Sequence, residues 1–489
     1  MIDAIYKNIG IEQPDVVDLL RDVQEHPKTW DVYKNGNTLG VNQVEQEKTA
    51  IKCQRYGPKN ISELSYFVAA VRPGFVTMLD RFLSRENFKY GIPILDELLS
   101  NRDVKGSYLA FQEQIMVILQ RGGLTGSESY KVIKAISKKK EKIIKSYYEK
   151  FSKGFVEYLI STGSDEESAK HATDECWKVI LDSASYLFNA SHAVAMALDS
   201  LYVAYPKMYW PIETYTALLN IYNDRGDDKD KIERCKNEML DVAGIKCVPC
   251  QFRKDNTKFT YDKEKNVIYD VLGSMKGMPK ATEEIMSKYA DQPFELFTDL
   301  LYELFKNGDL KPATIETLIQ ADYFSEFGKN GKLLQVFYEF TKRKHRISKQ
   351  LKDTTIETRY VWLRENERML PDESLDIQSQ LLFETSVFGN PKTLKKECRG
   401  WYFVTELSEK FPKIITMYRV DTGTVGQMKM AKKTFEKDPL VVGDMFKVVS
   451  YNTSPAYRYK KDPVTGESIR TVDSTKKDLW LNSFTRVAE

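Results

Sequence analysis

The stretch from Phe188 to Asn220 organises this chain, because its pattern predicts two consecutive helices. A turn of small residues precedes apolar and aromatic residues at close to the i, i+3, i+4, i+7 spacing of a packed helix. These residues are Val194, Leu198, Leu201, Tyr202 and Tyr205. Pro206 and Pro211 mark the end of one helix and the start of the next. The pattern therefore predicts two helices that meet at a polar corner, and by itself it assigns no function.

The chain has 489 residues, which is enough for roughly two to four domains. Its formal charge is only +3, so any basic surface that binds nucleic acid must be local. No segment is apolar over the roughly 18 residues that a membrane-spanning helix needs, and the first residues do not resemble a signal peptide. We therefore expect a cytoplasmic protein, in the host cytoplasm if it is viral, with no membrane partner.

Six cysteines without regular spacing argue against a disulfide framework. Cys247 and Cys250 form a lone CxxC pair, whereas a structural zinc site needs a second pair at a suitable distance. We interpret the pair as part of a buried turn and predict no metal site in this chain.

The main basic run begins at Lys131 and continues to Lys153. With helical spacing, five of its lysines share one face. They are Lys131, Lys134, Lys138, Lys142 and Lys145. Because like charges four residues apart repel each other, this stripe indicates either an anionic partner or a solvated face.

Five stretches in the first half of the sequence resemble motifs of one protein family. They are Gly40-Val-Asn-Gln-Val-Glu45, Arg72-Pro-Gly74, Tyr108-Leu-Ala-Phe-Gln-Glu-Gln114, Lys134-Ala-Ile-Ser-Lys138-Lys-Lys140 and Phe188-Asn-Ala-Ser-His192. Together they resemble the fingers segment of the bacterial replicative DNA polymerase III alpha subunit, a C-family polymerase. The resemblance implies a site for the triphosphate of an incoming dNTP. Its residues would be Arg72, Gln112, Glu113, Gln114, Lys134, Lys138, Lys139, Lys140, Ser191 and His192.

Each of these residues also has a purely structural interpretation. Arg72 can complement a helix dipole, and His192 can be a capping or core histidine. The polar residues 112–114 can form a solvated helix edge. Two departures from the family pattern weaken phosphate binding: Ala190 stands where the family has lysine, and Ile133-Lys134 replaces a pair of arginines. A lysine offers a point charge where arginine offers a planar, bidentate grip.

The second half of the sequence predicts DNA contacts. Residues 258–262 and 267–272 predict a two-stranded hairpin. The segment Gly273–Pro279 then resembles the family's helix-hairpin-helix element, whose amides hold a duplex phosphate. This implies DNA contacts by Lys276, Gly277 and Lys280, although Pro279 removes one amide and a plain turn remains the alternative.

Other segments of the second half carry weaker signals. Thr314–Phe324 resembles a family segment that packs behind the duplex-binding element. The cluster Lys342–Arg346 fits a DNA-facing patch or a solvated helix end equally well. Gln378–Phe383 resembles a sliding-clamp-binding peptide, and the alternative is an ordinary helix start.

Short β-type runs separated by Gly, Pro and Asp predict a small five-stranded barrel after residue 398. The family ends with an OB fold that meets single-stranded template. Tyr457, Arg458 and Tyr459 would suit base stacking and phosphate contacts there, whereas core or surface tyrosines of a β domain are the alternative.

The expected fold is therefore multi-domain and mainly α, with fingers and helix-hairpin-helix regions and a small C-terminal OB-like β-barrel. The expected divisions are a fingers/palm junction at 1–55, fingers at 56–235, a duplex-binding domain at 236–352, a linker at 353–397 and an OB-fold domain at 398–489.

Catalytic residues are not expected in this chain. Polymerisation in the family needs two metal ions held by palm carboxylates. The family holds them with an Asp-x-Asp strand and a Lys-Phe-Asp-Phe-Leu-Gly-Leu segment, and we find neither motif here. Because the resemblance covers only the carboxy-terminal half of the family's protein and the chain has its own Met1, we expect a split polymerase, with a phage as one candidate source.

The expected partners follow from that interpretation. They are a palm-bearing chain that binds Mg²⁺, primer-template DNA, dNTP and a sliding clamp at Gln378–Phe383. The alternative is a non-catalytic DNA-binding or scaffold protein descended from the polymerase. The departures at Ala190, Ile133 and Pro279 favour that alternative.

Overall fold

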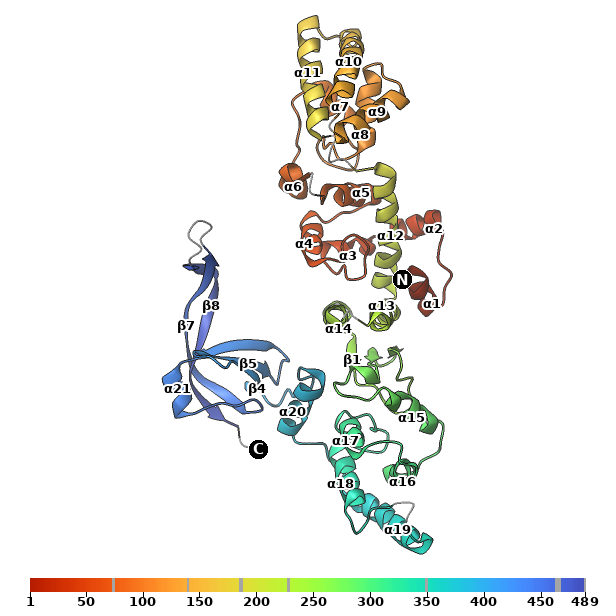
Figure 1. The fold of residues 1–489 in the computed structure, drawn as a ribbon, viewed down its shortest axis with the longest axis vertical. Coiled ribbons are helices and arrows are strands. Elements are labelled where there is room, and N and C mark those ends of the chain that lie inside the picture. Colours follow the sequence, from red (N-terminus) through yellow and green to blue (C-terminus); the bar gives the residue numbers. More distant parts are fainter. Residues whose placement is uncertain are drawn as a thin grey trace. The chain divides into compact units, whose positions relative to one another are not determined.

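The computed structural model describes residues 1–72, 75–138, 140–183, 188–226, 229–347, 351–461 and 468–487. The chain forms two compact units (Figure 1). Unit 1 comprises Met1–Cys247 and Tyr261–Ile268, and unit 2 comprises Val248–Thr260 and Tyr269–Glu489. Unit 1 is mainly helical, and unit 2 contains helices followed by a closed β-barrel. The predicted fold class, mainly α with a small C-terminal barrel, is confirmed.

Unit 1 is built from helices, and α12 (Ala190–Tyr209) is one of its three long ones, with α10 and α11. The other elements that precede α12 are α1 (Ile2–Ile9), α2 (Val16–Glu25), η1 (Pro27–Trp30), α3 (Asp31–Lys34), α4 (Glu47–Tyr56), α5 (Ile61–Ala70), α6 (Val76–Leu83), α7 (Pro93–Leu98), α8 (Gln112–Arg121), α9 (Gly126–Ser137), α10 (Glu141–Ser161) and α11 (Glu166–Ser183). Those that follow it are α13 (Pro211–Arg225) and α14 (Lys229–Ala243).

The two helices predicted between Phe188 and Asn220 are α12 and α13. Asn189 caps α12 by accepting a hydrogen bond from the His192 amide at 2.9 Å, and Pro211 is the first residue of α13. The predicted apolar face is buried in part: Leu201 is fully buried and Tyr202 and Tyr205 are nearly so, whereas Leu198 is half-buried and Val194 is 41% exposed. Pro206 lies inside α12 and does not end it, so the helix continues to Tyr209.

Lys207, near the C-terminal end of α12, is buried at the centre of a polar network. Its side chain is only 1% exposed, and its Nζ donates to the carbonyl oxygen of Leu39 at 2.6 Å. The ammonium group also forms an ion pair with Glu238 of α14. Glu238 accepts hydrogen bonds from the Tyr215 hydroxyl at 3.0 Å and from the Leu39 amide at 3.3 Å. The network therefore joins α12, α13, α14 and the chain around Leu39.

Gly40 follows Leu39 in this network and has φ +75°, a conformation that favours glycine. A Cβ atom at this position would lie 2.7 Å from Cδ2 of Leu218 in α13. The predicted Gly40–Glu45 stretch thus has a packing role, because only glycine lets the backbone approach α13 this closely.

Replacing Lys207 by Met should destabilise unit 1 by about 3 kcal/mol, because removing one partner of a buried ion pair leaves the other charge uncompensated. Urea-induced unfolding measures this loss. The matched control is Lys170→Met on α11, whose side chain is 63% exposed and pairs with Glu166. That change should cost less than about 0.5 kcal/mol. Equal losses in the two variants would show that the Lys207 network does not carry the stability assigned to it.

Helices α7 to α11 share one hydrophobic core at one end of unit 1 (Figure 1). Ile133 of α9, Phe151 of α10 and Trp177 of α11 all contribute to it. Glu128 at the start of α9 accepts from Lys150 of α10 at 2.8 Å. Hydrogen bonding to Lys150 and Thr125 lowers the pKa of Glu128 to about 2, so its carboxylate stays charged at neutral pH.

A three-stranded sheet of order β1-β3-β2 follows α14, and its strands are β1 (Lys246–Val248), β2 (Thr260–Asp262) and β3 (Val267–Tyr269). It contains the predicted hairpin and one further strand, β1, that the sequence pattern did not indicate. Cys250 is buried in a hydrophobic core, whereas Cys247 is partly exposed, so the buried-turn interpretation holds for one cysteine of the CxxC pair. Helix α14, which spans the expected domain boundary at 235/236, lies in unit 1.

The helical part of unit 2 has a single shared core. Its elements are η3 (Leu272–Ser274), α15 (Ala281–Tyr289), α16 (Phe297–Asn307), α17 (Pro312–Gln320), α18 (Asn330–Thr341), α19 (Asp353–Met369) and α20 (Ile377–Phe388). Ile315, Leu318 and Ile319 of α17 pack in the same core as Met286 of α15. The segment Thr314–Phe324 therefore shares a core with α15, and its packing behind a duplex-binding element stays a prediction.

The expected linker at 353–397 is wrong, because this segment contains α19 and α20. Leu363 of α19 is 1% exposed and belongs to the core of unit 2. The Glu367 carboxylate caps α16, accepting from the amides of Phe297 at 3.0 Å and Thr298 at 2.8 Å. The polar composition misled the prediction, because some of its charged residues are used as buried helix caps.

The C-terminal region is a closed barrel of strand order β4-β5-β6-β8-β7. The strands are β4 (Trp401–Leu407), β5 (Lys413–Arg419), β6 (Val425–Met430), β7 (Met445–Lys461) and β8 (Ser468–Arg486), with α21 (Lys432–Lys437) between β6 and β7. All pairs are antiparallel except β6 with β8. Strands β7 and β8 are longer than predicted and continue past the barrel as a two-stranded arm (Figure 1).

Two further expectations from the sequence concern membranes and metal ions. No described helix combines the length and the apolar character needed to cross a membrane. Within the described residues, no group of three or more His, Cys, Asp or Glu side chains is placed to hold a metal ion.

Candidate nucleotide and DNA-binding sites

The candidate nucleotide site is the place where the starts of α8 and α12 meet, which we call the α8–α12 junction and define as Ala110–Gln114 with Phe188–His192. The amide of Phe188 donates to the carbonyl oxygen of Ala110 at 3.2 Å, and the amide of Gln112 donates to that of Phe188 at 2.9 Å. Phe111 and Phe188 thus form an isolated parallel bridge. Two motifs that are far apart in the sequence therefore lie side by side.

Glu113 occupies the N-terminus of α12. One carboxylate oxygen accepts from Nδ2 of Asn189 at 2.7 Å, and the other accepts from the amide of Ala190 at 2.9 Å. An anion is favoured there because the first amides of a helix have no partners within the helix. The structure thus gives Glu113 a capping role that the sequence did not predict. A nucleotide contact by Glu113 stays a prediction.

Gln114 is engaged in a similar way at the start of α8. Its Oε1 accepts from the amides of Ala110 and Phe111, both at 2.8 Å, and its Nε2 donates to the Tyr108 carbonyl at 3.1 Å and to the Tyr66 hydroxyl at 3.2 Å. Burial raises the pKa of Tyr66, so its hydroxyl remains neutral. Through these hydrogen bonds, Gln114 stabilises the α8–α12 junction.

Arg72 lies beside the junction, just beyond the end of α5. Its Cζ lies 4.4 Å from the centroid of the Phe188 ring, and its Nη2 is 3.9 Å from Sδ of Met196. The ring of His192 lies 5.2 Å from the same Phe188 ring, measured between centroids. Phe188 therefore contacts both Arg72 and His192, a role that sequence reasoning missed although Phe188 is part of the motif.

Arg72, Ser191 and His192 remain available for an anionic ligand. Arg72 is partly buried, and its contacts are with the Phe188 ring and Sδ of Met196. Ser191 and His192 are both exposed. The hydroxyl and the imidazole at the start of α12, and the guanidinium just beyond the end of α5, are groups that bind phosphate oxygens well.

The basic run is divided between two helices, which corrects the prediction of one continuous helical face. Helix α9 ends at Ser137 and α10 begins at Glu141, so Lys138 and Lys140 lie in the connection. Both are exposed, as is Lys134, which contacts the Tyr130 ring at 5.6 Å. Lys139 lies outside the described residues. The chain reverses here because the apolar faces of α9 and α10 pack into one core.

Ile133, where the family pattern has arginine, is only 3% exposed and belongs to that core. A buried apolar side chain therefore stands where the family pattern has an arginine. This leaves Lys134 as the exposed cation of the pair.

Comparison with known proteins adds to this geometry. Residues 1–158 match the model of the bacterial DNA polymerase III alpha subunit finger domain. This part of the chain is related to the polymerase III fingers. We refer to residues 1–158 as the fingers region. Arg72, Glu113 and Lys134 lie within it, whereas Ser191 and His192 lie beyond the matched residues.

Curated relatives extend the similarity beyond the fingers region. The chain is 30% identical over 319 residues to DNA polymerase III subunit alpha of Campylobacter jejuni, covering 63% of this chain and 25% of that protein. It is 28% identical over 323 residues to the Aquifex aeolicus protein of the same name and 26% identical over 335 residues to that of Bacillus subtilis. The Aquifex aeolicus alignment covers 63% of this chain and 26% of that protein, and the Bacillus subtilis alignment covers 68% of this chain and 28% of that protein. The aligned part of the chain thus spans about a quarter of the length of these relatives.

The predicted DNA-contacting turn lies in unit 2 and is exposed at Lys276, Gly277 and Lys280. Gly277 has φ +82°, and no atom lies within 4 Å of the position of a Cβ there, so its backbone is open to a ligand. Lys280 is the N-cap residue of α15. The Lys276 amide donates to the carbonyl oxygen of Val387 at 3.0 Å, so only its side chain is left for DNA.

The turn differs in one respect from the expected helix-hairpin-helix. The element before it is η3, a 3-10 helix of three residues, whereas α15 after it has nine. Leu272 and Met275 are buried and anchor the turn in the core of unit 2.

The remaining predicted contacts have mixed outcomes. Tyr457, Arg458 and Tyr459 lie in β7, and their side chains are outside the described residues. In the Lys342–Arg346 cluster, Lys342 pairs with Glu339 and His345 stacks on Trp362 with the ring centroids 3.8 Å apart. Lys342 and His345 of this cluster therefore make contacts within the folded chain.

The clamp-like segment Gln378–Phe383 forms the start of α20, which Asp376 caps by accepting from the Ser379 amide. Leu381 is fully buried and Phe383 is 8% exposed. Two of the segment's apolar side chains are thus covered, which fits the alternative interpretation as an ordinary helix start, whereas Leu382 is 46% exposed. Binding of a clamp stays an untested prediction.

Replacing Glu113 by Ala should loosen the first turn of α12, because it leaves the Ala190 amide and the Asn189 amide group without an acceptor. The expected cost is about 1–2 kcal/mol. It should appear as faster hydrogen exchange of the peptide covering Phe188–His192, followed by mass spectrometry. The control is Glu167→Ala on the exposed side of α11, which should leave that peptide unchanged. Unchanged exchange in the Glu113 variant would contradict the capping role.

Proposed function

We propose that this chain supplies the fingers and DNA-binding parts of a replicative DNA polymerase, and that a separate palm-bearing chain supplies the catalytic carboxylates. The observation that carries the proposal is the α8–α12 junction, where the Phe188 ring contacts both Arg72 of the fingers region and His192, which is exposed beside Ser191. The match of residues 1–158 to a polymerase finger domain supports it.

The junction would bind the triphosphate of an incoming dNTP. The Arg72 guanidinium would pair with phosphate oxygens, the Ser191 hydroxyl would donate a hydrogen bond, and His192 would donate from its ring. Lys134 of α9, and Lys138 and Lys140 of the connection to α10, would add point charges, and so would Lys139. These groups would hold the nucleotide in place for reaction, which is a large part of catalysis in phosphoryl transfer.

The chemistry of the metal ions would come from the partner. Two Mg²⁺ ions bound by palm carboxylates neutralise charge on the attacking and leaving oxygens in such reactions. We assign no residue of this chain to them.

Unit 2 would bind primer-template DNA. Lys276 and Lys280 would contact phosphates of the duplex, and the open backbone at Gly277 would let a phosphate approach closely. Template would meet the barrel, where Tyr457, Arg458 and Tyr459 would stack on bases and contact the backbone.

Primer extension by the chain mixed with a palm-bearing chain from the same genome tests the proposal. The chain alone should extend nothing, and the mixture should extend a primer with a measurable dNTP KM. Arg72→Ala, His192→Ala and Lys134→Ala should each raise that KM by about tenfold, since a charge-assisted hydrogen bond contributes roughly 1.5 kcal/mol. Lys170→Ala, on the exposed surface of α11, should leave KM unchanged. Robust extension by the single chain would contradict the split arrangement, and unchanged KM in all three variants would contradict the dNTP site.

DNA affinity should fall steeply with salt, because lysine contacts to phosphates release condensed counterions. Lys276→Ala and Lys280→Ala should each reduce the slope of log K against log salt by about one. Fluorescence anisotropy of a labelled primer-template measures these slopes. A flat salt response of the unaltered chain would remove the phosphate-contact model, and the Lys170→Ala control should retain the full slope.

A non-catalytic DNA-binding or scaffold protein descended from the polymerase is the second candidate. The burial of Ile133 favours it, because a position with arginine in the family pattern can no longer face a phosphate. Primer extension by the mixed chains, with and without Lys134→Ala, distinguishes the two candidates. A raised dNTP KM supports the polymerase, whereas DNA binding without any reconstituted activity supports the scaffold.

A further inference from the structure

A groove between α10 and α11 lies outside the proposed nucleotide and DNA sites. Its volume is about 660 Å³, and residues from both helices line it. Helix α11 also lies beyond the residues that match the finger-domain model, which end at 158. The groove therefore lies partly within and partly beyond the residues that match that model.

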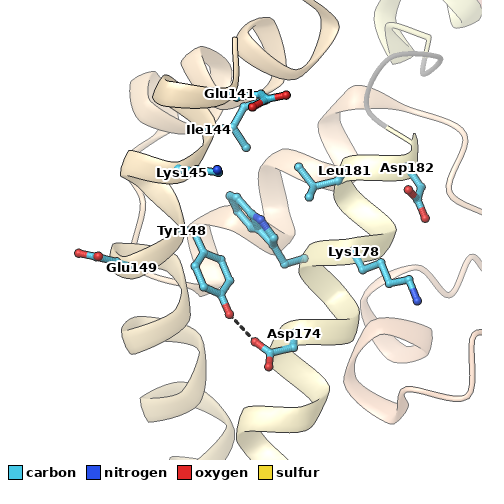
Figure 2. Close-up of a pocket in the computed structure, with 10 residues that line it drawn as sticks. Glu141, Ile144, Lys145, Tyr148, Glu149, Asp174, Lys178, Leu181 and Asp182 are labelled. Carbon is cyan, nitrogen blue, oxygen red and sulfur yellow. Dashed lines mark hydrogen bonds between the residues drawn. The ribbon is translucent and has the colours of Figure 1, made fainter. Parts of the chain in front are cut away.

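The floor of the groove is apolar and aromatic. Trp177 of α11 is 7% exposed, and its ring centroid lies 5.3 Å from that of Tyr148 of α10. Ile144 is half-buried and Leu181 is 37% exposed. Figure 2 shows Ile144 and Leu181 pointing toward one another across the groove from the two helices. This leaves apolar surface that water covers in the isolated chain.

A hydrogen bond holds the two walls together. The Tyr148 hydroxyl donates to the Asp174 carboxylate, so a side chain of α10 is tied to one of α11 (Figure 2). The polar end of Tyr148 is thereby satisfied, and its ring remains in place as part of the wall. The groove is thus built by a specific contact in addition to helix packing.

The side chains that line the groove carry more negative charges than positive ones. Four carboxylates line it, from Glu141, Glu149, Asp174 and Asp182, whereas only Lys145 and Lys178 are positive. The lining therefore has an excess of two negative charges (four minus two). A nucleic-acid backbone is disfavoured at such a surface, and a cationic ligand with apolar groups is favoured.

We propose that this groove docks an amphipathic helix of a partner protein, whose apolar face carries leucine-sized side chains and whose flanks carry Lys or Arg. A groove between two helices accepts the apolar stripe of a third helix, and anchors spaced i, i+3, i+4 and i+7 fill it. The leucine-sized groups would cover Trp177, Ile144 and Leu181, and the cationic flanks would face the four carboxylates. This goes beyond the proposed function and does not depend on it.

A fluorescein-labelled peptide of about 18 residues, made only of leucine and lysine with the two types on opposite helical faces, provides the probe. Fluorescence anisotropy with the full chain should show saturable binding. A peptide with glutamate in place of lysine should bind at least about tenfold more weakly, because it meets like charges.

Variants locate the site. Leu181→Asp should weaken binding of the lysine peptide by about tenfold or more, because it puts a charge against the apolar face. The matched control, Ile160→Asp, changes an apolar residue of α10 that is 45% exposed and does not line the groove, so it should bind as the unaltered chain does. Circular dichroism checks that both variants are folded. As a second variant, Glu141→Gln with Asp182→Asn removes two exposed charges and should weaken binding and reduce its dependence on salt.

Several results would overturn the proposal. These are equal binding by the Leu181 and Ile160 variants, equal binding of the glutamate peptide, and competition by a single-stranded oligonucleotide at this groove. Self-association of the unaltered chain in sedimentation that Leu181→Asp abolishes would instead assign the groove to a second copy of this chain.

Discussion

The buried ion pair between Lys207 and Glu238 is the constraint on which unit 1 depends. An ammonium group with 1% exposure is tolerated only if its charge and its hydrogen bonds are compensated. Glu238, the Leu39 carbonyl and the face of the Tyr215 ring provide that compensation. The consequence is that α12 is fixed at its C-terminal end by three other parts of the chain. Its N-terminal end, which carries Ser191 and His192, is thereby held as part of a rigid helix.

At the N-terminal end of α12, protein groups occupy amides that bind an anion in other helices. In the usual anion site, free amides of the first turn bind the phosphate. Here the Ala190 amide donates to Glu113 and the His192 amide donates to Asn189, so both are occupied by protein groups. Recognition of a triphosphate at the α8–α12 junction would therefore depend on side chains. The loss of the family's lysine at Ala190 increases the share that Arg72 must carry.

Local signals in the sequence predicted much of the fold but failed in two informative places. The strand runs after residue 398 predicted the barrel, because short β-type segments with turn residues between them have few other ways to bury their apolar faces. The segment 353–397 was missed because the Glu367 and Glu384 side chains, which suggest a solvated linker, are buried and accept hydrogen bonds from backbone amides. The lysine stripe was misplaced because charge spacing does not reveal where packing of α9 against α10 requires the chain to reverse.

The sequence by itself determined the helices α12 and α13, the start at Pro211 and the motifs that resemble polymerase fingers. These features depend on neighbouring residues and on local spacing, so they can be identified without the fold. Only the tertiary structure decided that Glu113 caps a helix 77 residues away, that Ile133 is buried and that Leu381 and Phe383 of the clamp-like segment are covered. Burial and long-range hydrogen bonding arise when distant segments pack together, and no local pattern specifies which side chains then remain free to bind a ligand.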